Sequence, residues 1–296
     1  MITTLTIASR ESPLAMWQAD HIKKNIQALY PAIKINIKGF KTQGDILLDQ
    51  SLAKIGGKGL FIKELEQALL NNKADLAVHS MKDLPMDIPK GFKLAVITER
   101  GDARDAFVSN QYDSLEALPP GSIIGTSSLR RQSQIQAKFP ELKILPLRGN
   151  LQTRLKKLDE KNYDAIILAA AGLIRMGLKE RIKLYIDPTL SIPAVGQGAL
   201  GIEILENNTE LLNLIAPLNN DTTSRCVLAE RTVSRSLAGS CTAPLGAYAS
   251  IRKNKIYMHG FVATPDGSQI IFSETNGPPD SPEDVGKKLS QLLIAQ

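Results

Sequence analysis

Short runs of apolar residues alternate with longer segments whose apolar positions recur at helical spacing, and this alternation continues through most of the chain. Residues 5–8 form the first strand-like run. Ser12-Pro13 follows, an N-cap residue with proline at the first helical position. The helix behind it is expected to bury one face, made by Leu14, Ile22, Ile26 and Leu29. Strands at residues 33–37, 75–78 and 94–97, with a helix at 60–70, complete one α/β unit.

A second unit of the same kind begins near Asp105. Its predicted strands cover residues 106–108, 122–125, 143–147 and 165–169, and a helix follows each of the last three. Residues 191–199 then interrupt the pattern with one proline and two glycines, before a strand at 200–204. We interpret this segment as a crossing back to the first unit. The sheets are expected to be largely parallel.

The last part of the chain has a different pattern, a long helix followed by short strands. The helix is predicted at residues 221–237, and a glycine-bounded loop separates it from strands at 248–250, 255–261 and 269–273. Ser281-Pro282 predicts the start of a final helix. The predicted fold class is α/β, with two similar α/β lobes that form a cleft and a small α+β C-terminal domain. The expected domains are residues 1–98 with 199–217, residues 99–198, and residues 220–296.

The composition narrows the functional classes. The 296 residues are 43% hydrophobic and 22% charged, which suits a globular chain of several domains. The N-terminus shows no signal-peptide pattern and no apolar run approaches the roughly 20 residues that span a bilayer, so we expect a cytoplasmic protein with no membrane partner. Two cysteines and three dispersed histidines predict neither a disulfide framework nor a metal site. A net charge of +6 permits nucleic acid as a partner without requiring one, and the 5% aromatic content argues against stacking platforms for single strands; no nucleic-acid partner is expected.

Arginines recur between residues 125 and 175, at the ends of predicted strands and in the first turns of predicted helices. Thr126-Ser127-Ser128 would open a helix with hydroxyls and backbone N–H groups, where the helix dipole stabilises an anion. A planar guanidinium grips a carboxylate through two parallel hydrogen bonds, so several together predict a pocket for a substrate with several carboxylates. The arginines concerned are Arg130, Arg131, Arg148, Arg154 and Arg175. Taken alone, residues 126–131 fit an N-cap followed by two solvated arginines equally well.

Residues 54–61 are glycine-rich and basic and precede a predicted helix. They do not form a phosphate loop, because Lys58 is followed by Gly59 where that motif needs a hydroxyl residue. The pattern is consistent with a mobile basic flap over an acidic ligand, formed around Lys54, Lys58 and Phe61, and equally with a flexible surface turn.

The run His79-Ser80-Met81-Lys82-Asp83 ends a predicted strand, the usual place for site residues in an α/β sheet. Residues this close in sequence rarely form a hydrolytic triad, which is assembled by the fold. Asp83 is therefore interpreted either as a carboxylate that holds a cationic intermediate or as the cap of a short turn beside an exposed Lys82.

The two cysteines have different surroundings. Cys241 lies in a loop of small residues with no His, Lys or Arg within a few positions, so the sequence shows no activated thiol there. Cys226 precedes the apolar Val227-Leu228 and fits a buried hydrophobe.

Together these segments resemble the porphobilinogen deaminase family of the tetrapyrrole pathway, also called hydroxymethylbilane synthases. The resemblance covers nearly the whole chain and rests on the joint order of segments, each of which could arise by chance. They are residues 8–15 (ASRESPLA), 56–59 (GGKG), 79–83 (HSMKD), 125–131 (GTSSLRR), 147–150 (LRGN), 193–198 (PAVGQG) and the loop around Cys241. The resemblance implies lobes like those of periplasmic binding proteins and a monomeric chain.

The resemblance also implies a chemistry. A transferase of this family deaminates four porphobilinogen molecules, joins them stepwise to a covalently bound dipyrromethane primer, and releases linear hydroxymethylbilane by hydrolysis. Cys241 would carry the dipyrromethane cofactor through a thioether, and Asp83 would be the catalytic carboxylate that stabilises the azafulvenium cation formed when porphobilinogen loses ammonia. Every ring brings an acetate and a propionate, which explains why one site would gather cationic side chains. Cofactor binding is implied for Lys82, Ser127, Ser128, Arg130 and Arg131, and substrate binding for Arg10, Arg148, Arg154 and Arg175.

One position departs from the family pattern. The cysteine loop commonly begins with two glycines, and the second is Ser240 here. Serine is small, and attachment of the cofactor is expected to survive unless the position requires a positive φ angle.

Two other functional classes remain open at this point. A two-lobed binding protein for an acidic small molecule would use similar lobes and an arginine-lined cleft, but it would not need Cys241 or Asp83. A basic nucleic-acid binder would show steeply salt-dependent binding.

Overall fold

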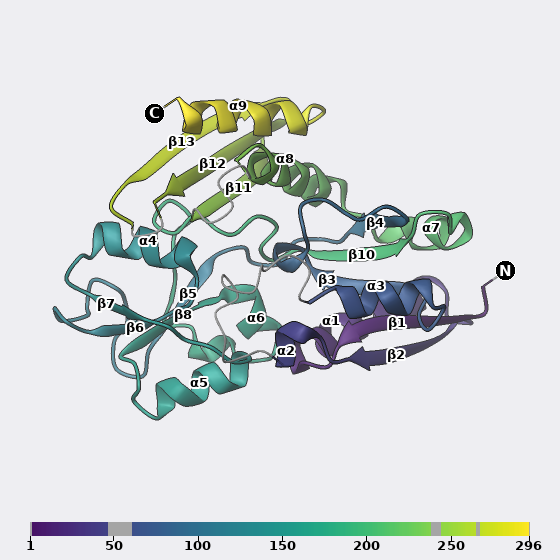
Figure 1. Cartoon of the computed structure of the whole chain (residues 1–296), viewed down its shortest axis with the longest axis horizontal. Coiled ribbons are helices and arrows are strands. Elements are labelled where there is room, and N and C mark those ends of the chain that lie inside the picture. Colours follow the sequence, from purple (N-terminus) through teal and green to yellow (C-terminus); the bar gives the residue numbers. More distant parts are fainter. Residues whose placement is uncertain (1, 47–60, 238–243, 265–266, 296) are drawn as a thin grey trace. The chain divides into compact units, whose positions relative to one another are not determined.

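The computed structural model describes residues 2–46, 61–237, 244–264 and 267–295. The chain divides into two compact units (Figure 1). The first unit comprises residues 1–100 and 199–224, and the second comprises residues 101–198 and 225–296. The chain therefore leaves the first unit near residue 100 and returns at residue 199. It leaves again after residue 224, within helix α8 (Asp221–Leu237).

The first unit is built on a five-stranded sheet of order β2-β1-β3-β10-β4. Strand β1 pairs in parallel with β2 and β3, whereas β10 runs antiparallel to both of its neighbours, β3 and β4. The strands are β1 (Thr4–Arg10), β2 (Lys34–Phe40), β3 (Leu76–Ser80), β4 (Phe92–Ile97) and β10 (Leu200–Leu205).

Helices cover this sheet and supply its core. Ser12 caps α1 (Pro13–Leu29) by accepting a hydrogen bond from the Ala15 N–H, with proline at the predicted first position. Ile22 and Ile26 are buried in a cluster with Leu5 and Ile7 of β1, but Leu29 is 47% exposed because the helix ends there, beyond the edge of that cluster. The other helical elements are α2 (Gln43–Ile46), α3 (Lys63–Leu70), η1 (Met81–Asp83), α7 (Thr209–Ile215) and η3 (Ala216–Leu218).

The second unit repeats the same sheet plan, with strand order β7-β6-β8-β5-β9. Strand β6 pairs in parallel with β7 and β8, and β5 runs antiparallel to β8 and β9. The strands are β5 (Asp105–Val108), β6 (Ile123–Gly125), β7 (Lys143–Leu145), β8 (Ala165–Ala169) and β9 (Leu184–Tyr185), and the helices are α4 (Leu129–Lys138), α5 (Leu151–Asp159), α6 (Ala170–Arg175) and η2 (Lys179–Arg181).

The inverted strands correct the expectation of largely parallel sheets. In each sheet, the strand that opposes its neighbours is the first one formed after the chain has crossed from the other unit: β5 after residue 100 and β10 after residue 198. Such a strand enters the sheet from a segment that comes from the other unit, not from a helix that follows a neighbouring strand. Its direction is therefore not fixed by the right-handed βαβ connection that makes neighbouring strands parallel.

The rest of the second unit is a three-stranded antiparallel sheet of order β11-β12-β13 with two long helices. Helix α9 begins at Pro282 as predicted, although the Ser281 side chain makes no cap hydrogen bond. Cys226 of α8 is 4% exposed, which confirms its interpretation as a buried hydrophobe. The elements are α8 (Asp221–Leu237), β11 (Leu245–Arg252), β12 (Lys255–Ala263), β13 (Ile270–Gly277) and α9 (Pro282–Ile294). No helix in the described ranges is both long and apolar enough to cross a membrane.

Candidate active site

Three predicted site residues of the first unit lie at one edge of its sheet. Arg10 is the last residue of β1, and Lys82 and Asp83 form the η1 turn directly after β3. Strands β1 and β3 are parallel neighbours, with Ala8 opposite Ala77, so both deliver their final residues to the same carboxyl edge. Lys82 and Asp83 are exposed at this edge. An α/β sheet presents its ligand-binding side chains there.

The η1 turn is held by the buried residues that flank it. Met81 is fully buried and its N–H donates to the Ala199 carbonyl at 3.0 Å, while Leu84 is 2% exposed. Ser80, the last residue of β3, exchanges hydrogen bonds of 2.8 and 3.2 Å with the Gln18 side chain on α1. The backbone that carries Lys82 and Asp83 is therefore fixed, although their side chains reach solvent.

Arg10 has two partners in the first unit. Its guanidinium is ion-paired with Asp45 of α2, and its Cζ lies 4.1 Å from the centroid of the Phe61 ring. A cation over an aromatic face is attracted by the ring quadrupole. Asp45 and this contact with Phe61 are absent from the sequence-based site, and no local pattern indicated Asp45.

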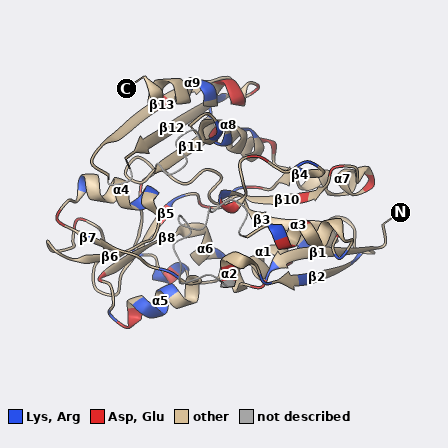
Figure 2. Cartoon of the chain, viewed as in Figure 1, with Lys and Arg blue, Asp and Glu red and all other residues tan. Residues whose placement is uncertain are grey.

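The predicted serines and arginines between residues 127 and 175 form a second group, in the second unit. Because β6, β7 and β8 are parallel, the segments after them leave one carboxyl edge. Ser127 and Ser128 follow β6, Arg148 follows β7, and Arg175 ends the helix that follows β8. Arg154 joins them from α5, where its Nε donates to the Gly149 carbonyl at 2.8 Å. Figure 2 shows basic residues on α4 and α5 of this unit.

The segment 126–128 makes more hydrogen bonds within the protein than the sequence indicated. Ser127 Oγ donates to the Leu147 carbonyl at 3.0 Å, and the Ser128 N–H donates to Thr126 Oγ1 at 3.2 Å. Ser128 is the N-cap residue of α4, but its side chain makes no cap hydrogen bond. The hydroxyl of Ser128 thus stands at a helix N-terminus without capping it, where an anion is favoured.

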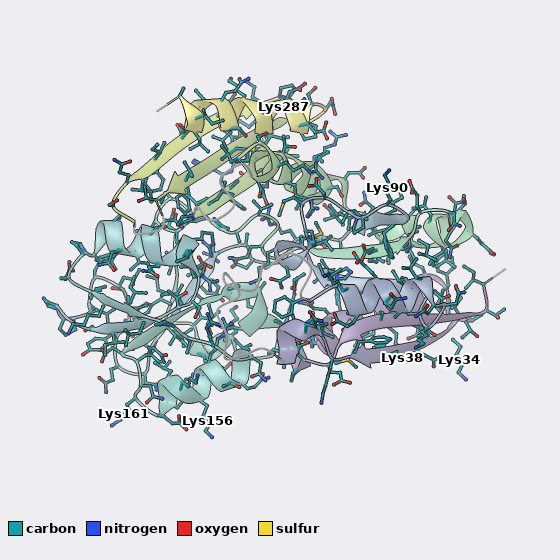
Figure 3. All side chains as sticks on the ribbon, in the orientation of Figure 1. Lys34, Lys38, Lys90, Lys156, Lys161 and Lys287 are labelled. Carbon is teal, nitrogen blue, oxygen red and sulfur yellow. The ribbon has the colours of Figure 1, made fainter. Side chains whose placement is uncertain are left out.

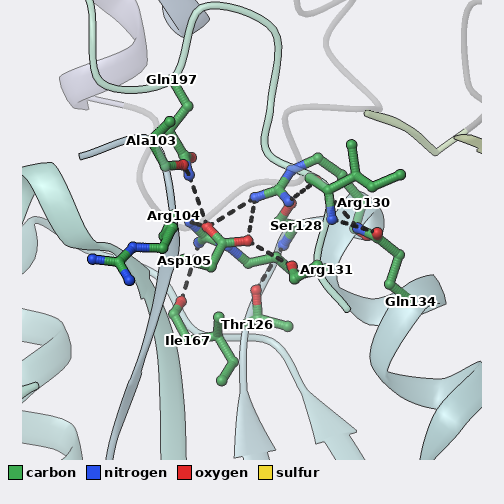
Figure 4. A network of polar contacts seen from close by, with 12 residues as sticks. Ala103, Arg104, Asp105, Thr126, Ser128, Arg130, Arg131, Gln134, Ile167 and Gln197 are labelled. Carbon is green, nitrogen blue, oxygen red and sulfur yellow. Dashed lines mark hydrogen bonds and ion pairs between the residues drawn. The ribbon is translucent and has the colours of Figure 1, made fainter. Parts of the chain in front are cut away.

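Arg130 and Arg131 are not solvated arginines on a helix surface. They are 7% and 6% exposed and converge on Asp105, the first residue of β5 (Figure 4). Arg130 Nη2 lies 2.8 Å from Asp105 Oδ2, and Arg130 Nη1 donates to the Ile192 carbonyl at 2.6 Å. Arg131 donates from Nη2 and Nε to Asp105 Oδ1 at 2.7 and 3.0 Å, and from Nη1 to the Ile167 carbonyl at 3.1 Å. By contrast, lysines such as Lys156 and Lys161 lie at the surface (Figure 3).

In the described contacts, the carboxylate oxygens of Asp105 only accept hydrogen bonds. Ser191 Oγ donates to Oδ2 at 2.8 Å and Gln197 Nε2 to Oδ1 at 3.0 Å, in addition to the two guanidiniums. Burial alone raises the pKa of Asp105, but the charges of Arg130 and Arg131 outweigh it and hold the pKa well below its ordinary value. The carboxylate is ionised, and this cluster of three buried ionised groups keeps one positive charge in excess.

Arg175 is partly buried. Its Nη2 donates to the Gly198 carbonyl at 2.6 Å, and burial lowers the pKa of Arg175 to about 10. The guanidinium therefore remains protonated at neutral pH, in surroundings where water screens its charge weakly.

Comparison with known proteins assigns the family. The family model described as porphobilinogen deaminase, dipyrromethane cofactor binding domain, matches residues 5–213, and the model of the porphobilinogen deaminase C-terminal domain matches residues 224–295. The chain belongs to the porphobilinogen deaminase family.

Close relatives support this membership. The porphobilinogen deaminase of Thiobacillus denitrificans is 59% identical over 293 residues, which cover 99% of this chain and 96% of the relative. That of Methylobacillus flagellatus is 61% identical over 292 residues, with 99% and 94% covered. Among solved structures, the methionine binding protein MetQ is similar at a TM-score of 0.48 and 13% identity, over 73% of this chain and 89% of that chain.

Membership of the porphobilinogen deaminase family makes the chain a transferase with a dipyrromethane cofactor. The described residues fit such a group. Its acetate and propionate side chains are anionic. The second unit offers the Ser128 hydroxyl, which makes no cap hydrogen bond, and the excess positive charge of the buried cluster of Asp105, Arg130 and Arg131. No group of three or more His, Cys, Asp or Glu side chains within the described ranges is placed to hold a metal ion.

Some residues considered in the comparison with the porphobilinogen deaminase pattern fall outside the described ranges. These are Lys54 and Lys58 of the expected flap, Cys241, and Ser240 beside it. Sequence reasoning also missed Asp105, because a single acid before the apolar residues 106–108 reads as the boundary of a strand. The available signal was an acid at the first position of a strand whose other residues, 106–108, are all apolar.

Proposed function

We propose that this chain joins four porphobilinogen molecules stepwise to a dipyrromethane primer and releases the linear tetrapyrrole hydroxymethylbilane. The observation that carries the proposal is the match of both family models, over residues 5–213 and 224–295, to a chain whose two sheets present arginine and serine side chains at their carboxyl edges. The substrate has an acetate and a propionate on each ring, and cationic side chains are the partners such a ligand requires.

Asp83 is the proposed catalytic residue. It lies exposed on a turn whose backbone is fixed between the buried Met81 and Leu84, so the point from which its side chain projects is set by the fold. Loss of ammonia from porphobilinogen leaves a cation, and a carboxylate fixed beside it lowers the barrier by stabilising the developing charge. Lys82, the preceding residue on the turn, carries a positive charge suited to a ligand carboxylate.

The arginines and serines are proposed to bind carboxylates. Ser127, Ser128, Arg130 and Arg131, with Lys82, are assigned to the cofactor, and Arg10, Arg148, Arg154 and Arg175 to the substrate. Because Arg130 and Arg131 each use most of their donors within the protein, their contribution to the cofactor is mainly the excess positive charge of their cluster with Asp105. Arg148 and Arg154 flank the turn at Gly149, so one short segment sets the positions of both.

Cys241 is the proposed anchor of the cofactor, through a thioether. When bound, dipyrromethane supplies the terminal pyrrole carbon to which the first substrate ring is added. We further propose a cytoplasmic, monomeric enzyme of three domains: residues 1–98 with 199–217, residues 99–198, and residues 220–296. The three separate sheets support that division.

The intact mass of the purified protein tests the cofactor and its anchor. The expected result is an excess over the polypeptide mass that equals two linked pyrrole units and is lost in Cys241→Ala. If the polypeptide has no added mass, incubation with porphobilinogen should install it, and failure to do so contradicts the proposal. Asp83→Asn tests the catalytic assignment, since it should keep the wild-type fold by circular dichroism but form no hydroxymethylbilane. Wild-type turnover in this variant would exclude the proposed role of Asp83.

A further inference from the structure

The Arg10–Asp45 pair of the first unit has the geometry of a carboxylate complex formed within the protein. Arg10 Nε donates to Asp45 Oδ2 at 3.2 Å and Nη2 donates to Oδ1, so two nitrogen atoms of the guanidinium meet the two carboxylate oxygens. This is the parallel arrangement by which arginine recognises a carboxylate on a ligand. The Asp45 side chain thus takes the place on Arg10 that an acetate or propionate would take.

Asp45 is held in position by contacts that do not involve Arg10. Thr42 donates to Asp45 Oδ2 from its hydroxyl at 2.7 Å and from its N–H at 3.3 Å. Burial raises the pKa of Asp45, but the hydrogen bonds from Arg10 and Thr42 outweigh it and hold the pKa below its ordinary value. Asp45 is therefore a fixed, ionised carboxylate at neutral pH.

The pair is accessible to a solute. The side chains of Arg10 and Asp45 are 25% and 23% exposed, whereas the arginine–aspartate cluster around Asp105 is buried. Phe61 stacks on the guanidinium and packs against Gly44, where there is no room for a Cβ atom. The ring contacts the guanidinium independently of Asp45, so Arg10 keeps this support when Asp45 is displaced.

We propose that Asp45 is an internal competitor of the substrate: a carboxylate of porphobilinogen replaces Asp45 on Arg10, and Asp45 sets the affinity and selectivity of this position. The inference rests on the proposed substrate-binding role of Arg10. A fixed intramolecular carboxylate competes at a high effective concentration, so a solute with one carboxylate displaces it poorly. A ligand with a second anionic group, bound elsewhere in the site, displaces it readily. The position is thereby selective for substrates with several carboxylates.

Asp45→Asn tests the inference in the loaded enzyme. Loss of the competing charge should lower KM for porphobilinogen roughly three- to tenfold, the factor expected for one charge-assisted interaction between partly exposed groups. Asp20→Asn is the matched control, because it removes a carboxylate from another ion pair of the same unit, with Lys24, and changes the net charge equally. Its KM should equal that of the wild type. Intact masses of all variants should show equal cofactor loading, so that KM is compared between enzymes in the same state.

Arg10→Lys separates this inference from the proposed function. Lysine keeps the charge but lacks the planar fork, so KM should rise and the gain from Asp45→Asn should shrink in the double variant. An unchanged KM in Arg10→Lys means that Arg10 does not bind substrate, and the proposed function fails at that residue. A raised KM in Arg10→Lys with an unchanged or raised KM in Asp45→Asn overturns the competitor alone and makes Asp45 a residue that merely orients Arg10.

Discussion

Replacing Asp105 by asparagine should destabilise the protein strongly while preserving the shape of the side chain. Every described contact to the two oxygens comes from a donor: Arg130, Arg131, Ser191 and Gln197. An amide at this position removes the negative charge and turns an N–H₂ group toward one set of donors. Two buried guanidiniums then lose their counter-charge, which costs about 3–5 kcal/mol when a buried pair is broken on one side.

Urea unfolding followed by circular dichroism measures this loss, with Asp159→Asn as the control. Asp159 also pairs with an arginine of the second unit, Arg181 at 2.6 Å, but its side chain is 50% exposed. Water screens that pair, and its loss should cost less than about 1 kcal/mol. The reasoning is refuted if Asp105→Asn and Asp159→Asn lose similar amounts, because burial would then not be what makes the Asp105 cluster valuable.

The comparison of the wild type with Asp105→Asn also predicts how the free energy of unfolding depends on pH. The folded-state pKa of Asp105 lies below its ordinary value of 3.8, because the arginine charges outweigh burial. A group whose pKa is depressed by folding contributes stability that is complete above the unfolded pKa and is lost as the pH falls toward the folded pKa. The stability difference between wild type and Asp105→Asn should therefore be constant near neutral pH and shrink below about pH 4.

Two further variants test other parts of the structure. His79→Ala should cost about 3–5 kcal/mol in urea unfolding, because it leaves Glu203 buried without its 2.9 Å partner; His259→Ala, whose partner Glu274 is 80% exposed, is the control and should lose less than about 1 kcal/mol. Gly149→Ala should lower the thermal midpoint by the equivalent of about 1–3 kcal/mol, because φ at this residue is +113° and a Cβ would lie 2.7 Å from Thr153 Cγ2; an unchanged midpoint would contradict that strain.

Local signals predicted local structure well. Ser12-Pro13 begins α1 with the expected cap, and the strands expected at residues 106–108 and 165–169 are present as β5 and β8. The short elements α2, α7 and β9 were missed, because segments of two to seven residues carry too little periodicity. Strand direction was missed where it depends on a crossing between units, which no local pattern records.

The candidate site was predicted by type of residue more than by environment. Arg130 and Arg131 open a helix, as expected, but their burial depends on partners that lie far away in sequence. Asp105 is 25 and 26 residues from them, and the Ile192 carbonyl is 62 residues from Arg130. Such pairings follow from the tertiary fold. The local sequence around Arg130 and Arg131 is therefore equally consistent with buried and with solvated side chains.

The position of β10 within its sheet has a consequence for how the chain is made. Strand β10 lies between β3 and β4, and β4 pairs with no other strand in the described sheet. A nascent chain that has emerged only to residue 100 therefore holds four strands of the first sheet but lacks the one that joins the fourth to the rest. The sheet closes only after residues 200–205 have left the ribosome, once the second α/β sheet is already synthesised. Pairing across this long sequence separation delays folding, and β4 exposes an unpaired edge throughout that interval.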